Sequence, residues 1–220
     1  MSIDLEEVVV PVYIINLKHR IERLNHITEQ FEERPEFVTT VIEACQNKVG
    51  AIGLWQSIVR VIEIAIHNEE DVIIICEDDH EFTKNYSKDY LFEHIVKGYE
   101  QGAEILSGGI GSFGYAVPLS KNMFWINPFQ STQFIILYSR IFPKILSYVF
   151  KTDDVADLVL SSLSSHKMVL FPFVSRQKDF GYSDITFLHN EEPGLVQKMF
   201  DITEKRLGKI QNAYIKYILR

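Results

Sequence analysis

The chain has 220 residues, of which 46% are hydrophobic and 24% charged, values that are ordinary for a folded globular protein. Its net charge of −8 leaves no excess of Lys and Arg for neutralising a nucleic acid, which argues against nucleic-acid binding but not against a local diphosphate pocket. Two cysteines, Cys45 and Cys76, are too few for a disulfide framework. We therefore expect a cytoplasmic protein, without a signal peptide or a membrane span.

The first half of the chain alternates predicted strands with predicted helices. Strands are expected at residues 11–17, 37–44, 72–76 and 103–107, and helices at 20–33, 50–67 and 88–98. This alternation predicts an α/β fold with a mainly parallel central sheet flanked by helices.

The second half has a looser pattern. We expect a flexible loop at residues 108–114, strands at 132–138 and 168–171, and helices at 140–150 and 153–164. The expected organisation is a single domain over residues 1–200, with a nucleotide-binding half at about 1–107 and an acceptor half at 108–190, followed by a C-terminal amphipathic helix at 201–220.

Three carboxylates follow the most apolar predicted strand. The run Val72–Cys76 leads directly into Glu77, Asp78 and Asp79. In an open parallel sheet, ligands bind beyond the carboxyl ends of the strands, where this cluster is expected. A hard divalent cation held by one or two carboxylates and substrate phosphates would offset the repulsion between them. The alternative interpretation is an ordinary acidic turn after a core strand.

Two arginines follow the first predicted strand. Asn16 closes that strand, Arg20 opens the next helix, and Arg23 lies one turn further along. The planar guanidinium suits bidentate binding of phosphate, and the positive end of a helix adds to it. Alternatively, both arginines lie on the surface and pair with Glu22 or Glu29.

Together these segments resemble glycosyltransferase family 25, the lipopolysaccharide-biosynthesis and procollagen-galactosyltransferase type. The matching motifs, in chain order, are Tyr13-Ile14-Ile15-Asn16-Leu17 with Arg20 and Arg23, Glu43-Ala44, Gly53 with Ser57, Glu77-Asp78-Asp79, residues 132–140 ending in Ser139-Arg140, and Pro172, Gln177 and Ser183-Asp184-Ile185. The resemblance covers about residues 11–187.

The resemblance implies a GT-A type nucleotide-diphospho-sugar transferase fold, a UDP-sugar donor and inversion at the anomeric carbon. The implied activity moves a hexose, galactose first among the candidates, to a glycan such as lipopolysaccharide or another surface polysaccharide, with Mn²⁺ or Mg²⁺. The residues expected to bind the nucleotide sugar are Asn16, Arg20, Arg23, Glu43, Ser57, Glu77 and Asp78.

The remaining expected site residues carry the metal and the proton transfer. Asp79 is expected to bind the metal directly, with His189 as a further ligand. Inversion needs a general base near the attacking hydroxyl, and Asp157 fits the resemblance best. The alternative for Asp157 is a charge favoured by the dipole at a helix N-terminus. Asp184 is expected either at the donor sugar or as a turn cap.

Two departures from the family pattern leave alternatives open. The residue after Ser57, where the family has a histidine, is Ile58, and residues 108–129 have no clear match. One alternative is therefore a degenerate protein that binds sugar nucleotides without turnover. A weaker alternative, a phospho-receiver domain, needs an aspartate at the end of another apolar strand, but the corresponding segment 123–127 ends in Asn127.

The tail at residues 201–220 carries five basic residues and an apolar helical face. One interpretation is a terminal helix docked on its own domain. The other is peripheral contact with an anionic membrane at the inner face of the cell, where a lipid-linked glycan acceptor would lie.

Overall fold

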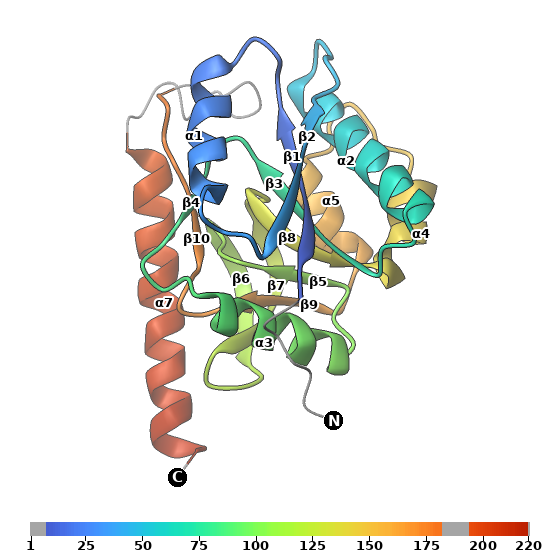
Figure 1. The fold of residues 1–220 in the computed structure, drawn as a ribbon. Helices are drawn as coiled ribbons and strands as arrows, with labels where there is room; N and C mark the ends of the chain where they lie inside the picture. The colour runs from blue at the N-terminus through green and yellow to red at the C-terminus, as the bar shows by residue number, and fades with distance from the viewer. Residues whose placement is uncertain (1–7, 182–193, 220) are drawn as a thin grey trace.

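The computed structural model describes residues 8–181 and 194–219, and Figure 1 shows these as a twisted central sheet between helices. The strands are β1 (Val10–Asn16), β2 (Phe37–Glu43), β3 (Val72–Glu77), β4 (His80–Phe82), β5 (Ile105–Ser107), β6 (Ser112–Pro118), β7 (Met123–Gln130), β8 (Phe134–Tyr138), β9 (Lys167–Leu170) and β10 (Ser175–Gln177). The helices are α1 (Ile21–Phe31), α2 (Gly50–His67), α3 (Lys88–Glu100), the 3₁₀ turn Ser139–Ile141, α4 (Phe142–Ser147), α5 (Ala156–Leu163) and α7 (Leu195–Tyr217).

The main sheet has eight strands in the order β2-β1-β3-β8-β5-β9-β7-β6. Six of them run in one direction, whereas β7 and β8 run the opposite way. This arrangement confirms the expected α/β class with a mainly parallel central sheet flanked by helices. In the β1–β2 and β1–β3 pairs, Asn16 faces Glu43 and Ile15 faces Glu77, so the carboxyl ends of three parallel strands meet at one edge.

Two apolar layers hold the helices on the sheet. Residues of α2, α4, α5 and α7 form one core with one face of the strands, and residues of α1 and α3 form the other core with the opposite face. β3 contributes to both, with Ile73 and Ile75 in one core and Ile74 and Cys76 in the other. Alternating strand residues on two buried faces explain why this strand reads as an uninterrupted apolar run.

The second half differs from the sequence-based expectation at the glycine-rich segment. Residues 108–114 were expected to form a flexible loop, but Ser112, Phe113 and Gly114 belong to strand β6, which forms a hairpin with β7. A Cβ on Gly109 would lie 2.0 Å from the carbonyl oxygen of Ser175. The glycine there permits a close backbone approach, so its function is packing and the expectation of a flexible loop was wrong.

Further elements were missed or misplaced. β4 and β10 form a separate two-stranded antiparallel sheet that the sequence pattern did not indicate, because three-residue strands give too short a period to detect. The helix expected over residues 140–150 is shorter, since α4 ends at Ser147. The tail helix begins at Leu195 and ends at Tyr217, earlier than the expected range of 201–220.

Candidate active site

A pocket of about 660 Å³ lies at the carboxyl ends of β1 and β3. One wall comes from the first half of the chain and includes the loop at residues 44–48 and the first turns of α2. The other wall comes from the β7–β8 connection, the start of α5, residues 177–180 and the start of α7. The expected site residues that line it are Arg20, Arg23, Glu77, Asp78, Asp79 and Asp157. The fold therefore brings together groups that are far apart in the sequence.

The acidic trio occupies the end of β3 and the turn that follows it. Asp78 and Asp79 are only 5% and 6% exposed, so this is not a solvated acidic turn. Glu77 is held at both ends: its N–H donates to the Gln133 carbonyl at 3.0 Å, and its Oε1 accepts from Thr132 Oγ1 at 2.6 Å. The strand end and the β7–β8 connection thus fix the position of the first carboxylate.

Two guanidinium groups compensate the charge of the trio. Arg23 Nη1 lies 3.1 Å from Asp78 Oδ1 and 3.5 Å from Asp79 Oδ2, and Arg20 Nη1 lies 3.7 Å from Asp78 Oδ2. Arg23 is 4% exposed. It is therefore not a surface residue, and the surface alternative is wrong for it.

Burial and mutual repulsion set the protonation of the cluster. Burial first, and then the Asp79 charge, raise the pKa of Glu77 above its ordinary value. Burial and the Asp78 charge raise the pKa of Asp79, against the opposing effects of Arg23 and of a hydrogen bond from Gln177. Such shifts mean that an added positive charge at this position would stabilise the ionised carboxylates.

The donor set at Asp79 fits a divalent cation that is shared with a ligand. Asp79 Oδ2 accepts from Gln177 Nε2 at 2.9 Å, but Oδ1 is buried and makes no hydrogen bond. Over residues 8–181 and 194–219, no group of three or more His, Cys, Asp or Glu side chains is arranged as a complete metal site. A cation would therefore need phosphate oxygens or waters beside this carboxylate, as Mg²⁺ sites commonly do.

Asp157 projects into the same pocket from the opposite half. It is the second residue of α5, and its Oδ2 accepts from the Ser131 N–H at 2.9 Å while Oδ1 accepts from the Leu158 N–H at 2.7 Å. Burial raises the pKa of its carboxyl. Ser131 has a φ of 86°, a left-handed conformation that is uncommon outside glycine and that directs its N–H at the carboxylate. Asp157 is thus both a helix-terminal charge and a pocket residue.

Other expected site residues lie beside the pocket or outside the residues that the structure describes. Asn16 is buried and Glu43 is exposed, and neither is among the residues that line the described pocket. Ser57 is fully buried: its Oγ donates to the Gly53 carbonyl and accepts from the Cys45 N–H, each at 2.8 Å. It therefore holds the loop that lines the pocket. Asp184 and His189 lie outside the described residues.

Several pocket residues were not assigned a role from the sequence. Gln177, which binds Asp79, appeared only as part of the family motif. Thr132 appeared only as the first residue of an expected strand in the matched segment, where a single hydroxyl does not indicate a role. Lys178 contacts the acidic turn through its backbone, since its N–H donates to the Asp79 carbonyl at 2.7 Å. Its side-chain Nζ lies 3.2 Å from His26 Nδ1.

Comparison with known proteins gives a limited result. No family model and no curated protein matches the chain. Among solved structures, an apo UDP-glucose pyrophosphorylase is 12% identical with a TM-score of 0.47, covering 90% of this chain and 82% of that one. A protein from Thermus thermophilus described as mannose-1-phosphate geranyltransferase is 7% identical with a TM-score of 0.45, covering 74% and 73%. At these sequence identities and TM-scores, the similarities give no evidence about activity or substrate.

Proposed function

We propose that the pocket binds a UDP-sugar, with UDP-galactose the first candidate, and that the chain transfers the hexose to a glycan or lipid-linked glycan acceptor. The proposal includes a GT-A type fold, assistance by Mn²⁺ or Mg²⁺ and inversion at the anomeric carbon. It also places the protein in the cytoplasm, in contact with the inner face of a membrane. It keeps the expected donor-binding roles of Arg20, Arg23, Glu77 and Asp78, and the expected metal-binding role of Asp79.

The observation that carries the proposal is the meeting of three kinds of group in one pocket: two arginines, an acidic cluster with an unpartnered oxygen on Asp79, and Asp157 on the facing wall. Arg20 immediately precedes α1, where the positive end of the helix also favours an anion. A diphosphate would thus meet both a guanidinium and a helix N-terminus. A volume of about 660 Å³ is in the range of pockets that hold a nucleotide-sized ligand.

The arrangement suits departure of a diphosphate. Asp79 would hold a divalent cation, which would neutralise the charge developing on the leaving phosphate. Arg20 and Arg23 lie against the same carboxylates and would orient the diphosphate beside them. Their fixed positions limit the reorganisation needed as charge builds up.

On the acceptor side of the pocket, the proposed general base is Asp157. Its carboxylate would accept the proton of the acceptor hydroxyl while the new bond to the anomeric carbon forms and the bond to the UDP oxygen breaks. Two backbone N–H donors fix its orientation, and burial raises its pKa toward a value suited to a general base. Attack from the face opposite to the diphosphate would give inversion.

The isoleucine at position 58, where the family has a histidine, is only weak evidence against activity. This residue is 1% exposed, belongs to the core beneath α2 and is not part of the pocket lining. Isoleucine at that position therefore removes no group from the pocket wall. A protein that binds sugar nucleotides without turnover remains the second proposal, and only a transfer assay separates the two.

The test is thermal unfolding of the full chain with UDP, UDP-galactose, UDP-glucose or ADP, with Mn²⁺ or with EDTA. Binding to the native state raises the melting temperature, so a rise with UDP ligands that needs Mn²⁺ supports the donor and the metal. UDP release with glycan acceptors then tests transfer. Absence of any nucleotide effect contradicts the assignment, whereas binding without UDP release favours the non-catalytic alternative.

A further inference from the structure

Helix α7 has a docked half and an exposed half. In the docked half, Val196, Phe200, Thr203 and Leu207 are buried at helical spacing. Further along the helix, Gln211 Nε2 donates to the Lys121 carbonyl at 2.7 Å, in the turn between β6 and β7. Figure 1 shows the final turns of α7 extending past this point, beyond the body of the domain.

Apolar side chains surround the end of α7, and one of them continues its buried face. Ile215, Tyr217, Ile218 and Leu219 are 37%, 63%, 68% and 50% exposed. Ile218 follows Leu207 by eleven residues, about three turns of helix, and so lies on the line of the buried stripe. The stripe that docks the first half is thus uncovered at the tip. Over the described residues, no helix is long and apolar enough to cross a bilayer.

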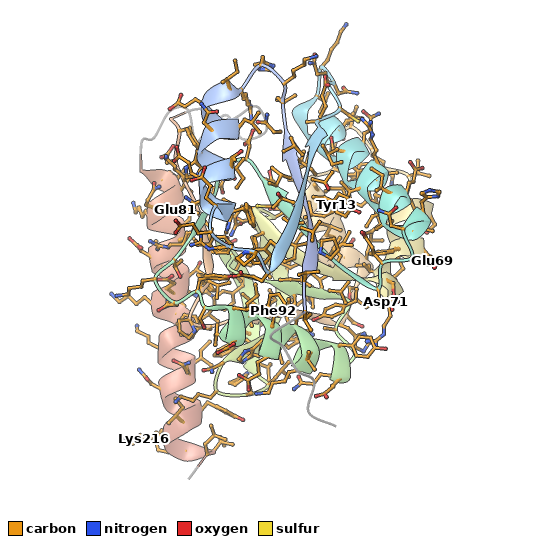
Figure 2. All side chains as sticks on the ribbon, in the orientation of Figure 1. Tyr13, Glu69, Asp71, Glu81, Phe92 and Lys216 are labelled. Atoms are coloured by element: carbon orange, nitrogen blue, oxygen red, sulfur yellow. The ribbon has the colours of Figure 1, made fainter. Side chains whose placement is uncertain are left out.

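The charge of this segment is opposite to that of the whole chain. Residues 205–220 contain five Lys or Arg and no acidic residue, although the chain has a net charge of −8. Lys205, Lys209 and Lys216 fall within about 40° of one another on a helix, on the side facing away from the buried stripe. Figure 2 shows Lys216 on the lower end of α7, away from the sheet.

A second exposed apolar group lies near the same end. Val117 and Leu119, at the end of β6 and in the turn after it, are 51% and 38% exposed. This turn contains Lys121, whose carbonyl binds Gln211. The uncovered surface therefore combines the helix tip with the adjoining turn and is bordered by lysines.

We propose that the last two turns of α7 and the β6–β7 turn bind an anionic bilayer surface, with Tyr217, Ile218 and Leu219 entering the headgroup region. Aliphatic and tyrosine side chains partition at this depth, and lysines reach the lipid phosphates on long flexible stems. Lysine attraction to an anionic leaflet is an electrostatic contribution that a neutral partner would not provide. The tip and the active-site pocket lie at different ends of α7, because Val196 and Met199 line that pocket. The inference rests on the membrane contact included in the proposed function and specifies its surface, but it does not depend on the transferase activity.

The test is co-sedimentation of the full chain with phosphatidylcholine vesicles, with and without phosphatidylserine, and without any nucleotide. We expect binding to the anionic vesicles that falls with added salt. The Y217D/I218D variant should bind about tenfold less, and the K205E/K209E/K216E variant should lose about as much or more. Ile66→Asp changes an isoleucine on α2 that is 48% exposed, and this control should bind as the parent does. Thermal unfolding checks that each variant folds.

Equal binding by the parent chain and Y217D/I218D would overturn the proposal, as would equal binding to vesicles with and without phosphatidylserine. Light scattering after gel filtration tests a second copy as the occupant. A dimer that Ile218→Asp dissociates, together with absence of vesicle binding, would assign the tip to self-association and also overturn it.

Discussion

Arg23 Nη1 donates to Asp78 Oδ1 at 3.1 Å, and this buried ion pair joins helix α1 to the turn after β3. Both side chains are almost wholly shielded from water, so neither charge has solvent as an alternative partner. Arg23 therefore contributes to the stability of the protein as well as to the pocket.

Replacing Arg23 by Ala should destabilise the protein. The change leaves Asp78 and Asp79 buried without their main compensating charge, at a cost of about 3–5 kcal/mol in the free energy of unfolding. Urea unfolding followed by circular dichroism measures it. A change below about 1 kcal/mol would contradict this interpretation of the pair.

Replacing Arg20 by Ala should instead weaken nucleotide binding. Its guanidinium is 3.7 Å from Asp78, at the longer limit of an ion pair, and lines the pocket beside the N-terminus of α1. We expect the UDP affinity to fall about tenfold or more, as when a charged hydrogen bond to phosphate is lost. The melting temperature should hardly change. Isothermal titration calorimetry measures the affinity. The control is Arg140→Ala, because Arg140 lies against Tyr99 and is not part of the pocket lining. A stability loss without an affinity change would make Arg20 structural.

Gly53 offers a test of the loop beneath the pocket. A Cβ at this position would lie 2.4 Å from the Cys45 carbonyl oxygen, so Gly53→Ala must push the 44–48 loop away from α2. We expect a loss of about 1–3 kcal/mol together with weaker UDP binding. The control is Gly208→Ala, in α7, where the nearest atom to a Cβ is 3.7 Å away. There alanine should stabilise by about 0.5–1 kcal/mol. If both variants had the same stability, the Cys45 carbonyl would not prevent a side chain at position 53.

The sequence pattern predicts the long elements of the fold but not the short ones. Apolar periodicity identified α1, α2, β1 and β3, because these long elements bury faces with a clear period. It also placed the acidic trio at a strand end, where the topology puts the pocket. The short β4 and β10 and the glycine-rich β6 carry no such period, and their positions depend on contacts with distant segments. Thr132 and Gln177 could not be assigned roles for the same reason, since long-range packing alone brings them to Glu77 and Asp79.

Histidine burial predicts an acid-sensitive stability. His94 is buried in α3, where its Nδ1 lies 2.7 Å from the Tyr90 carbonyl, and burial lowers its pKa below the ordinary value. As the pH falls through about 6.5, the unfolded chain takes up a proton that the folded chain resists, so stability is lost toward acid. His94→Gln should flatten the dependence of unfolding free energy on pH in this range. His67→Gln, an exposed position, is the control. An identical slope in both variants would contradict the prediction.

Thr132 tests how Glu77 is held. Thr132→Val keeps the shape but removes the hydroxyl that donates to Glu77 Oε1 at 2.6 Å, whereas Thr132→Ser keeps it. If the carboxylate position matters for transfer, the valine variant should lose about tenfold or more in kcat and the serine variant should recover most of it. UDP release at saturating donor measures kcat. Equal rates for the two variants would show that the hydroxyl has only a packing role.

The central prediction concerns Asp79. Asp79→Asn removes a charge that burial already disfavours, as its raised pKa shows, while an amide oxygen still accepts from Gln177. We therefore expect an unchanged or higher melting temperature in EDTA, although Arg23 loses its ion pair with Asp79. Metal-dependent stabilisation by UDP should disappear, and transfer should fall about 100-fold or more, since one carboxylate oxygen is the proposed protein ligand of the cation. Asp153→Asn, at an exposed position, is the matched control and should change neither property. Retention of both turnover and the Mn²⁺ response by Asp79→Asn would place the metal elsewhere, because an amide cannot replace the charge of the carboxylate.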